Sequence, residues 1–195
     1  MGYPVIVKSQ FFEASAGISQ ASVVETLDQL ERRVRFIHES LGTAAIVEQY
    51  IDGRELYVGV LGNERLVVFP VWEMSFATMP GNRWRIATER VKWSTKYQKR
   101  NGIMTARAVL DPELSSQIQR IAKRVCRALD LNGYSRIDLR LTQDNRFYVL
   151  EANPNPNLSY GEDFAESAES DGVPYDRLLD RILQLGLRWK PERTG

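Results

Sequence analysis

Strict alternation of apolar and charged residues from Tyr134 to Leu141 is the feature that most constrains the fold of this sequence. The apolar positions are Ile137, Leu139 and Leu141, and the charged positions are Arg136, Asp138 and Arg140. A period of two residues places these sets on opposite faces of a β-strand. A turn signal follows at residues 143–145 and a second strand at Arg146–Ala152, so this segment predicts an antiparallel hairpin.

The predicted hairpin brings two acids together. With a two-residue turn at residues 144–145, Asp138 lies opposite Glu151, and Arg136 lies opposite Asn153. Opposed residues have Cβ atoms about 5 Å apart, so the two carboxylates would repel each other. A divalent cation would offset this repulsion, and two acids with an amide supply the oxygen ligands that Mg²⁺ or Mn²⁺ prefers.

An alternative interpretation needs no metal. Asp138 and Glu151 would then form a solvated sheet edge, with Arg136 and Arg140 as their ion-pair partners. The choice depends on register, because a slip of one residue would move the two acids to opposite faces.

The rest of the chain predicts short strands and helices in an α+β arrangement. Asp111 and Pro112 supply the N-cap and first-turn proline of one helix, and Gly42 ends another. Residues 73–102 predict a long loop with short strand or helix pieces, and such loops are often functional. The other expected elements are strands at Pro4–Lys8, Ala44–Tyr50, Arg54–Leu61 and Arg65–Val71 (the last three as an antiparallel meander), a loop at Ser9–Ser19, and helices at Ser22–Leu41, Glu162–Ser170 and Tyr175–Leu187.

Length and composition bound the class of protein. A chain of 195 residues makes one domain or two small ones. No apolar run approaches the roughly 20 residues of a membrane span, and the first residues do not resemble a signal peptide. The single cysteine, Cys126, suits a reducing compartment and a place in the core, so we expect a cytoplasmic protein without a membrane partner. The single histidine, His38, is expected on a solvated helix face.

The net charge of +1 hides two strongly charged segments. Arg83–Arg100 holds seven Lys or Arg and one Glu, whereas Glu151–Asp180 holds eight Asp or Glu and one Arg. The segments are either two solvated faces or a site that holds an anion with one segment and a metal with the other. Trp84 and Trp93 interleave with the basic residues as in nucleic-acid-binding proteins. The near-zero net charge argues against that partner, and we expect no nucleic acid.

Five segments, in this order and spacing, resemble the ATP-grasp superfamily, most closely its D-alanine–D-alanine ligase-like branch. They are Pro4-Val-Ile-Val-Lys8, Val47-Glu-Gln-Tyr-Ile51, Asp52-Gly-Arg-Glu-Leu56, Arg136-Ile-Asp138 and Leu150-Glu-Ala-Asn153. The resemblance implies an ATP-grasp fold of antiparallel sheets flanked by helices. Residues 1–48 would form an incomplete first nucleotide-binding subdomain, and residues 49–195 would form the second.

The resemblance implies a reaction that joins a small-molecule carboxylate, such as an amino acid, to an amine. ATP phosphorylates the carboxylate in these ligases, and the amine then displaces phosphate from the acyl phosphate. No protein nucleophile is needed, which agrees with the lack of a nucleophile–base set in the sequence. The protein supplies positioning and charge neutralisation.

The resemblance also implies roles for particular residues, with ATP and Mg²⁺ (or Mn²⁺) as cofactors. The basic segment would close over the triphosphate. Lys8 and Lys96 would contact phosphates, Glu48 with the backbone of Gln49, Tyr50 and Ile51 would bind adenine, Glu55 would accept a hydrogen bond from the ribose, Arg136 would be the catalytic cation, and Asp138, Glu151 and Asn153 would be the metal ligands.

The sequence departs from the family in three places. Pro154–Asn157 replaces a Ser/Gly-rich loop that helps to hold the second substrate, which argues against specificity for D-alanine. The expected phosphate-covering loop, Glu13–Gly17 with Ser15, is poor in glycine. The domain and the first nucleotide-binding elements that the family places before the lysine strand are absent, so we expect a fragment of a longer enzyme or a truncated chain.

A second function stays open on the same residues. A chain without those elements could be a non-catalytic module that keeps the fold and binds nucleotide or a partner protein. Its open nucleotide cleft would expose apolar surface, and a homodimer would cover that surface.

Overall fold

The computed structural model describes residues 2–12, 15 and 17–190 and divides the chain into two compact units. Unit 1 holds residues 1–52 and 75–104, and unit 2 holds residues 53–74 and 105–195. The subdomains inferred above from the family resemblance, residues 1–48 and 49–195, stay a prediction.

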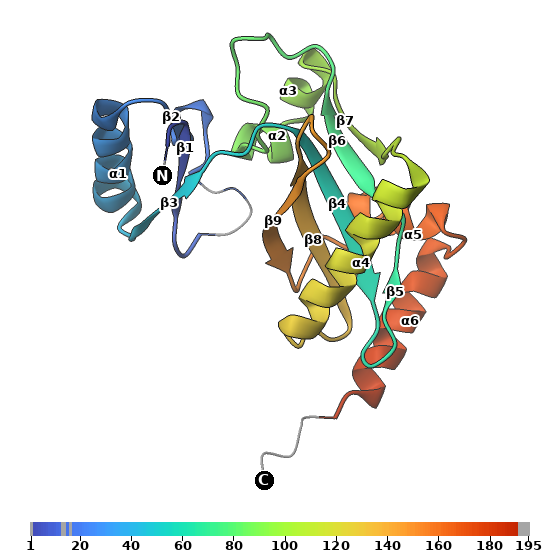
Figure 1. The fold of residues 1–195 in the computed structure, drawn as a ribbon. Coiled ribbons are helices and arrows are strands. Elements are labelled where there is room, and N and C mark those ends of the chain that lie inside the picture. Colours follow the sequence, from blue (N-terminus) through green and yellow to red (C-terminus); the bar gives the residue numbers. More distant parts are fainter. Residues whose placement is uncertain (1, 13–14, 16, 191–195) are drawn as a thin grey trace. The chain divides into compact units, whose positions relative to one another are not determined.

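A three-stranded antiparallel sheet and one helix form the first part of unit 1 (Figure 1). The sheet has the order β2-β1-β3, and Ile37 of the helix packs against Val5, Val7 and Val24. The elements are β1 (Val5–Ser9), the 3₁₀ turn η1 (Gln20–Ser22), β2 (Val23–Val24), α1 (Leu27–Leu41) and β3 (Ala45–Gln49).

The predicted helix at Ser22–Leu41 begins too early. Val23 and Val24 pair with β1 as a short strand, which suits two β-branched residues. The helix begins after Thr26, whose hydroxyl accepts a hydrogen bond from the Gln29 N–H as an N-cap. Gly42, in the left-handed conformation with φ of 65°, ends the helix as predicted.

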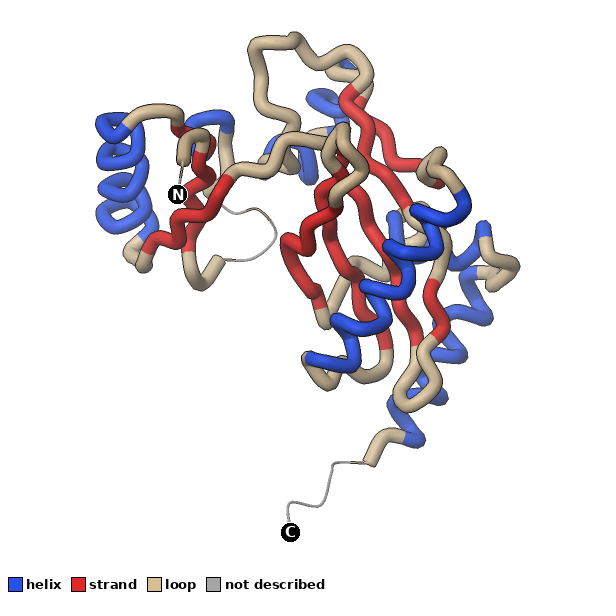
Figure 2. Tube along the Cα trace, in the orientation of Figure 1, coloured by secondary structure: helices blue, strands red, loops and turns tan. Residues whose placement is uncertain are grey.

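The second part of unit 1 lies in the segment predicted as a long loop. The segment carries two short helices, α2 (Glu89–Trp93) and α3 (Thr95–Arg100), after an irregular stretch that Figure 2 shows in tan. Ile86 and Trp84 pack with Val23 and Tyr50, so a small apolar cluster joins this segment to the first part of the unit.

Unit 2 is built on a sheet with the strand order β7-β6-β4-β8-β9, in which β5 also pairs with β4 (Figure 1). β6 and β7 carry the chain between the two units. The elements are β4 (Arg54–Leu61), β5 (Val67–Val68), β6 (Trp72–Phe76), β7 (Ile103–Arg107), α4 (Pro112–Ala128), β8 (Tyr134–Leu141), β9 (Phe147–Asn153), α5 (Asp163–Ser170) and α6 (Tyr175–Arg188).

Two expectations about these strands are wrong. β3 pairs with β1 in unit 1 rather than continuing into β4, so the meander loses its first strand. The strand predicted at Arg65–Val71 is only Val67–Val68, since β4 takes β6 and β8 as its main partners. The strand at Ile103–Arg107 was not predicted.

Helices cover both faces of the unit 2 sheet (Figure 1). On one face, α4 packs Ile118, Ala122 and Cys126 against the apolar residues of β4 and β8. On the other face, α5 packs Phe164 over Gly59, where an added Cβ would lie 2.9 Å from the Phe69 ring and 3.2 Å from the Phe164 ring. Gly59 therefore permits the close approach of α5 to the sheet.

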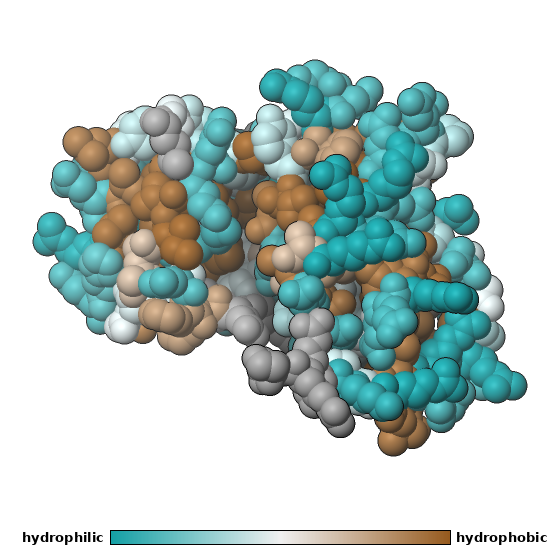
Figure 3. Space-filling view, turned by 60° about the horizontal axis from the view of Figure 1, so that its bottom comes forward, coloured by the Kyte–Doolittle hydropathy of each residue, from teal (hydrophilic) through white to brown (hydrophobic). Residues whose placement is uncertain are grey.

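Part of the surface of unit 1 is apolar. In Figure 3, apolar patches interrupt the surface of the part of unit 1 that carries α1, and the exposed large hydrophobic residues of this unit include Leu27, Phe36 and Ile46. His38 is exposed on α1 and Cys126 is buried, as predicted. None of the described helices is long and apolar enough to cross a membrane.

Candidate active site

A row of charged side chains lies on one face of β4 and β8 in unit 2. The register places Glu55 opposite Arg140 and Tyr57 opposite Asp138. Arg140 Nη2 donates to Glu55 Oε2 at 2.8 Å, and the Tyr57 hydroxyl donates to Glu55 Oε1 at 2.7 Å. Arg140 and Glu55 are 4% and 6% exposed, so this ion pair is withdrawn from solvent and depends on its hydrogen bonds.

A second ion pair on the same face joins the partly buried Arg136 to the buried Asp138. The guanidinium donates twice to the carboxylate, from Nε to Oδ1 at 2.7 Å and from Nη2 to Oδ2 at 2.8 Å. The guanidinium also lies 4.5 Å from the centre of the Tyr57 ring, and its Nη1 is 3.8 Å from Asp163 Oδ2. Strand, ring and helix together fix the orientation of Arg136.

The surroundings of this face shift several pKa values. Burial raises the pKa of Asp138 to about 6; Arg136 opposes this shift, while Glu151 and Glu55 add to it. Burial lowers the pKa of Arg136, but the charge and hydrogen bonds of Asp138 outweigh this, and the net shift is upward. Burial also raises the pKa of Tyr57 well above its ordinary value. Burial thus favours the neutral forms of Asp138 and Tyr57 on this face.

The predicted pairing across the hairpin is confirmed, but the predicted turn is wrong. Asp138 lies opposite Glu151 and Arg136 opposite Asn153. The loop has three residues, 143–145, closed by the Thr142 N–H to Arg146 carbonyl bond, with Asn145 at φ of 60°. A register shift between Asp138 and Leu139 then leaves one extra residue on β9, which restores the predicted pairs.

The predicted metal ligands differ in their surroundings. Both Asp138 oxygens accept bonds from Arg136, Glu151 is exposed, and Asn153 Oδ1 accepts the Asn155 N–H at 2.8 Å. In the part of the chain that the structure describes, no three His, Cys, Asp or Glu side chains form a ready metal cluster. The alternative interpretation is correct in pairing Arg136 with Asp138, yet the two side chains are only 13% and 10% exposed, so the pair is not a solvated edge.

Most of the predicted nucleotide residues of unit 1 lie on β1 and β3 or directly after β3. Lys8 forms an ion pair with Glu48 across the two strands. Gln49 ends β3, and Tyr50 after it is buried, with its ring 5.1 Å from that of Trp84. Lys96 is exposed on α3. Lys96 is thus open to solvent, whereas Lys8 is half-buried and its ammonium group is paired with Glu48.

Comparison with known proteins decides the family. Residues 1–184 match the family model described as D-ala D-ala ligase C-terminus. The chain belongs to this family. The D-alanine–D-alanine ligase of Desulfotalea psychrophila is 32% identical over 195 residues, which cover 100% of this chain and 57% of that protein.

Solved structures of the family share the fold. The D-alanine–D-alanine ligase from Bacillus anthracis, complexed with ATP, matches with a TM-score of 0.72 at 21% identity, over 96% of this chain and 53% of that one. VanG D-Ala:D-Ser ligase from Enterococcus faecalis matches with a TM-score of 0.73 at 23% identity, over 95% and 50%. The fold is therefore ATP-grasp, and the chain spans about half the length of the relatives it matches.

Two residues of this D-alanine–D-alanine ligase C-terminal family member contact Arg136 but were not predicted from the sequence. Tyr57 and Asp163 both touch Arg136, and neither was among the predicted site residues. Alternation along β4 places Tyr57 on the face of Glu55, which is a signal that the sequence does carry. Asp163 could not be found this way, because a loop and the start of α5 bring it to the sheet.

The segment expected as a phosphate-covering loop is only partly described. Glu13, Ala14 and Ala16 lie outside the described residues. Gly17 has φ of 74°, and its carbonyl accepts a hydrogen bond from the buried Arg33 of α1. The end of this loop is thus attached to the helix.

Proposed function

We propose that this chain carries the nucleotide- and metal-binding part of an ATP-dependent carboxylate–amine ligase. The observation that supports this most is the pair of opposed carboxylates, Asp138 and Glu151, on an ATP-grasp sheet. Beside them, Arg136 donates two hydrogen bonds to Asp138. Burial is the main cause of the raised pKa of Asp138 and the charge of Glu151 adds to it, so a cation bound beside the two carboxylates would favour the ionised form of Asp138.

The predicted metal ligands fit a magnesium ion. Asp138, Glu151 and Asn153 offer carboxylate and amide oxygens on adjacent strands, which is the donor chemistry that Mg²⁺ selects. When bound, the ion would neutralise phosphate charge in the transferring group. Asp138 would have to share its oxygens between Arg136 and the ion, and Arg136 would then keep the carboxylate oriented.

The proposed reaction has two steps. An oxygen of the substrate carboxylate attacks the γ-phosphorus of ATP, the bond to ADP breaks, and an acyl phosphate forms. A deprotonated amine then attacks the acyl carbon, and inorganic phosphate leaves as the amide forms. Arg136, held by Asp138, Asp163 and the Tyr57 ring, would stabilise the negative charge that develops in both steps.

The residues of unit 1 and Glu55 would bind the nucleotide. Lys8 and Lys96 would contact phosphates, and Glu48 with the backbone of residues 49–51 would bind adenine. Glu55 is proposed as the ribose acceptor, although both of its oxygens already accept hydrogen bonds. Ribose binding would therefore require Glu55 to accept a further bond at an oxygen that Tyr57 or Arg140 already uses.

Calorimetry of ATP binding with and without Mg²⁺ tests the proposal. We expect Mg²⁺-dependent binding that Asp138→Ala and the shape-conserving Asp138→Asn both abolish. Asp144→Asn removes an exposed carboxylate from the same hairpin and should leave binding unchanged. Equal ATP affinity in wild type and Asp138→Asn would contradict the proposed metal site.

A non-catalytic binding module is the second candidate, because both oxygens of Asp138 and of Glu55 already accept hydrogen bonds within the sheet. The module would bind Mg²⁺–ATP in the same way but would release no ADP. Steady ADP release by this chain in the presence of candidate amino acids would reject the module and support the ligase.

A further inference from the structure

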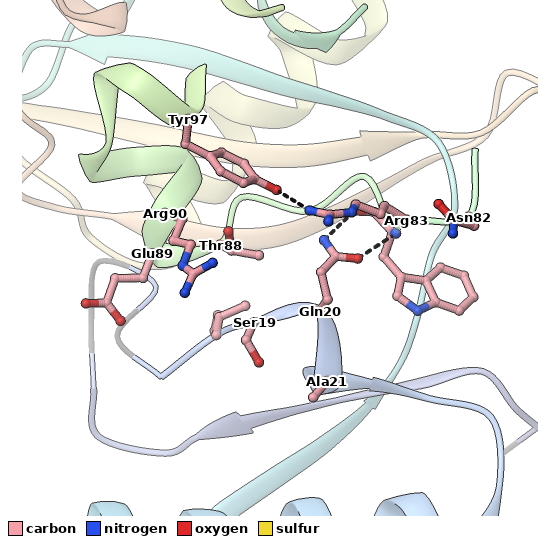
Figure 4. A pocket seen from close by; sticks show the side chains of 11 residues that line it. Ser19, Gln20, Ala21, Asn82, Arg83, Thr88, Glu89, Arg90 and Tyr97 are labelled. Carbon is pink, nitrogen blue, oxygen red and sulfur yellow. Dashed lines mark hydrogen bonds between the residues drawn. The ribbon is translucent and has the colours of Figure 1, made fainter. Parts of the chain in front are cut away.

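A pocket of about 680 Å³ lies within unit 1 (Figure 4). Its walls come from residues 18–21, the loop at residues 82–84 and the helices α2 and α3. None of the predicted nucleotide residues of this unit lines it, namely Lys8, Glu48, Gln49, Tyr50, Ile51 and Lys96. The pocket therefore shares no residue with that set, although its arginines belong to the basic segment that the family resemblance places over the triphosphate.

Two guanidinium groups give the pocket its charge. Arg83 Nη1 donates to the Tyr97 hydroxyl at 3.2 Å, and within residues 2–12, 15 and 17–190 Arg83 pairs with no carboxylate. Across those same residues, the Arg90 side chain makes no hydrogen bond or ion pair; its guanidinium points toward Ser19 (Figure 4). Glu89 also lines the pocket, but its carboxylate points away from Arg83 and Gln20 (Figure 4).

The wall that faces these cations is held in place by hydrogen bonds. The Gln20 carboxamide binds the backbone of Trp84 twice, with Nε2 donating to the carbonyl at 2.9 Å and Oε1 accepting the N–H at 2.8 Å. The Trp84 ring packs edge-on against buried Tyr50. Segments that are far apart in sequence are thus joined around the pocket before any ligand binds.

We propose that this arginine pocket, lined by Arg83, Arg90, Tyr97 and Gln20, binds an oxyanion of the ligase's co-substrate, in addition to the carboxylate and amine that react. The inference rests on the proposed ligase function. An arginine fork matches the planar geometry of a carboxylate and also binds phosphate, and the pocket has the size of a small-molecule site. The substrate class is therefore an acidic molecule, such as a dicarboxylate or a phosphorylated amino acid, rather than D-alanine.

Calorimetry with three probes tests this pocket without turnover. Glutarate carries a second carboxylate, O-phosphoserine carries a phosphate, and D-alanine carries neither. We expect glutarate or O-phosphoserine to bind at least about tenfold more tightly than D-alanine, since charge-assisted hydrogen bonds of about 1.5–3 kcal/mol correspond to at least a tenfold change. The tighter of the two probes identifies carboxylate or phosphate as the recognised group.

Variants locate the binding. Arg83→Gln and Arg90→Gln should each weaken the tighter probe about tenfold, and Arg83→Lys and Arg90→Lys should retain part of the affinity. Arg100→Gln removes an exposed arginine from the same basic segment but outside the pocket, so it should have no effect. Circular dichroism of each variant excludes loss of folding.

Two results would overturn the proposal. Equal affinity for all three probes would show that the pocket does not recognise a second oxyanion. A loss of Mg²⁺–ATP affinity in Arg83→Gln and Arg90→Gln that matches the loss of probe affinity would assign the pocket to the triphosphate. If wild type binds the probe through these arginines but does not bind Mg²⁺–ATP, the ligase assignment fails while the oxyanion site stands.

Discussion

The two charged regions of this molecule differ in how their arginines are partnered. On the sheet face of unit 2, Arg140 is buried, Arg136 is partly buried, and each donates to a carboxylate. In the pocket of unit 1, Arg83 and Arg90 are exposed, and no carboxylate of the described residues pairs with either. The carboxylates of the sheet thus neutralise Arg136 and Arg140, whereas Arg83 and Arg90 are available to an anionic ligand. Removal of each arginine measures this difference.

Arg140→Met should produce the largest loss of stability. The substitution leaves Glu55 buried without its cation, and breaking a buried pair from one side costs about 3–5 kcal/mol. Urea unfolding measures the loss. Arg146→Met, which removes the exposed partner of Asp144 from the neighbouring hairpin, is the matched control and should cause no measurable loss.

A second substitution separates pairing from packing. Glu55→Leu combined with Arg140→Met removes both charges and should recover much of the stability lost in Arg140→Met alone, because no uncompensated carboxylate remains. If the double variant is less stable than the single one by a further 3–5 kcal/mol or so, packing rather than charge pairing governs this part of the sheet.

The stability of unit 2 should depend on the protonation of Asp138. Its pKa is about 6 in the fold and lower in the unfolded chain, so the folded state binds more protons between about pH 4 and 6. Stability contributed by this group is then present at low pH and falls as pH rises through that range. From pH 4 to pH 7, wild type should lose on the order of 2–3 kcal/mol relative to Asp138→Asn, as a raised pKa of about two units requires.

Urea unfolding of both proteins at several pH values measures this difference. The comparison with Asp138→Asn cancels the contributions of the other titrating groups. A constant difference between the two proteins from pH 4 to pH 7 would contradict the raised pKa. Added Mg²⁺ should favour wild type over Asp138→Asn at pH 7 if the ion binds the ionised carboxylate.

The hairpin shows what alternation can and cannot predict. The period of two residues correctly placed Asp138 and Glu151 on one face, because burial of Ile137 and Leu139 fixes that face. The assumed two-residue turn was wrong, and an unpredicted bulge on β9 compensated for it. Opposed pairs depend on the sum of loop length and bulges, and neither is visible in an apolar–polar pattern.

Unit 1 was harder to predict for a different reason. Local pattern located β1 and most of α1, but Val23 and Val24 belong to a strand only because β1 provides its partner. The arginine pocket joins residues 18–21 to residues 82–97 through the Gln20–Trp84 bonds. No periodicity relates these segments, so the sequence revealed the basic composition of the region but not its shape.

Arg33→Met should cause a smaller loss than Arg140→Met. Arg33 is also buried, yet its bonds go to the Gly17 carbonyl and the Ser22 hydroxyl, and its Nε has no hydrogen-bond partner. Methionine removes these bonds but also removes a charge that burial disfavours, as the lowered pKa of Arg33 indicates. We expect a net loss of about 1 kcal/mol by urea unfolding.

The exposed neighbour Arg32, which pairs with Asp28 on the surface of α1, supplies the control for this site. Arg32→Met should have less effect than Arg33→Met, since exposed pairs contribute little. A loss in Arg33→Met as large as that in Arg140→Met would show that a buried arginine can be as important without a carboxylate partner, and the contrast between the units would fail.

Arg83→Gln and Arg90→Gln should have the smallest effect on stability, below about 0.5 kcal/mol each, because both side chains are exposed and neither completes an ion pair with a described residue. With a ligand bound, these two substitutions should have a much larger effect on stability. A saturating oxyanion binds only the folded pocket and raises the melting temperature of wild type, and each variant should show a clearly smaller increase, as a tenfold weaker affinity requires. Thermal melts with and without glutarate or O-phosphoserine therefore distinguish an arginine that stabilises the fold from one that binds a ligand. A clear drop in melting temperature without ligand would place Arg83 and Arg90 in the first group, with Arg136 and Arg140.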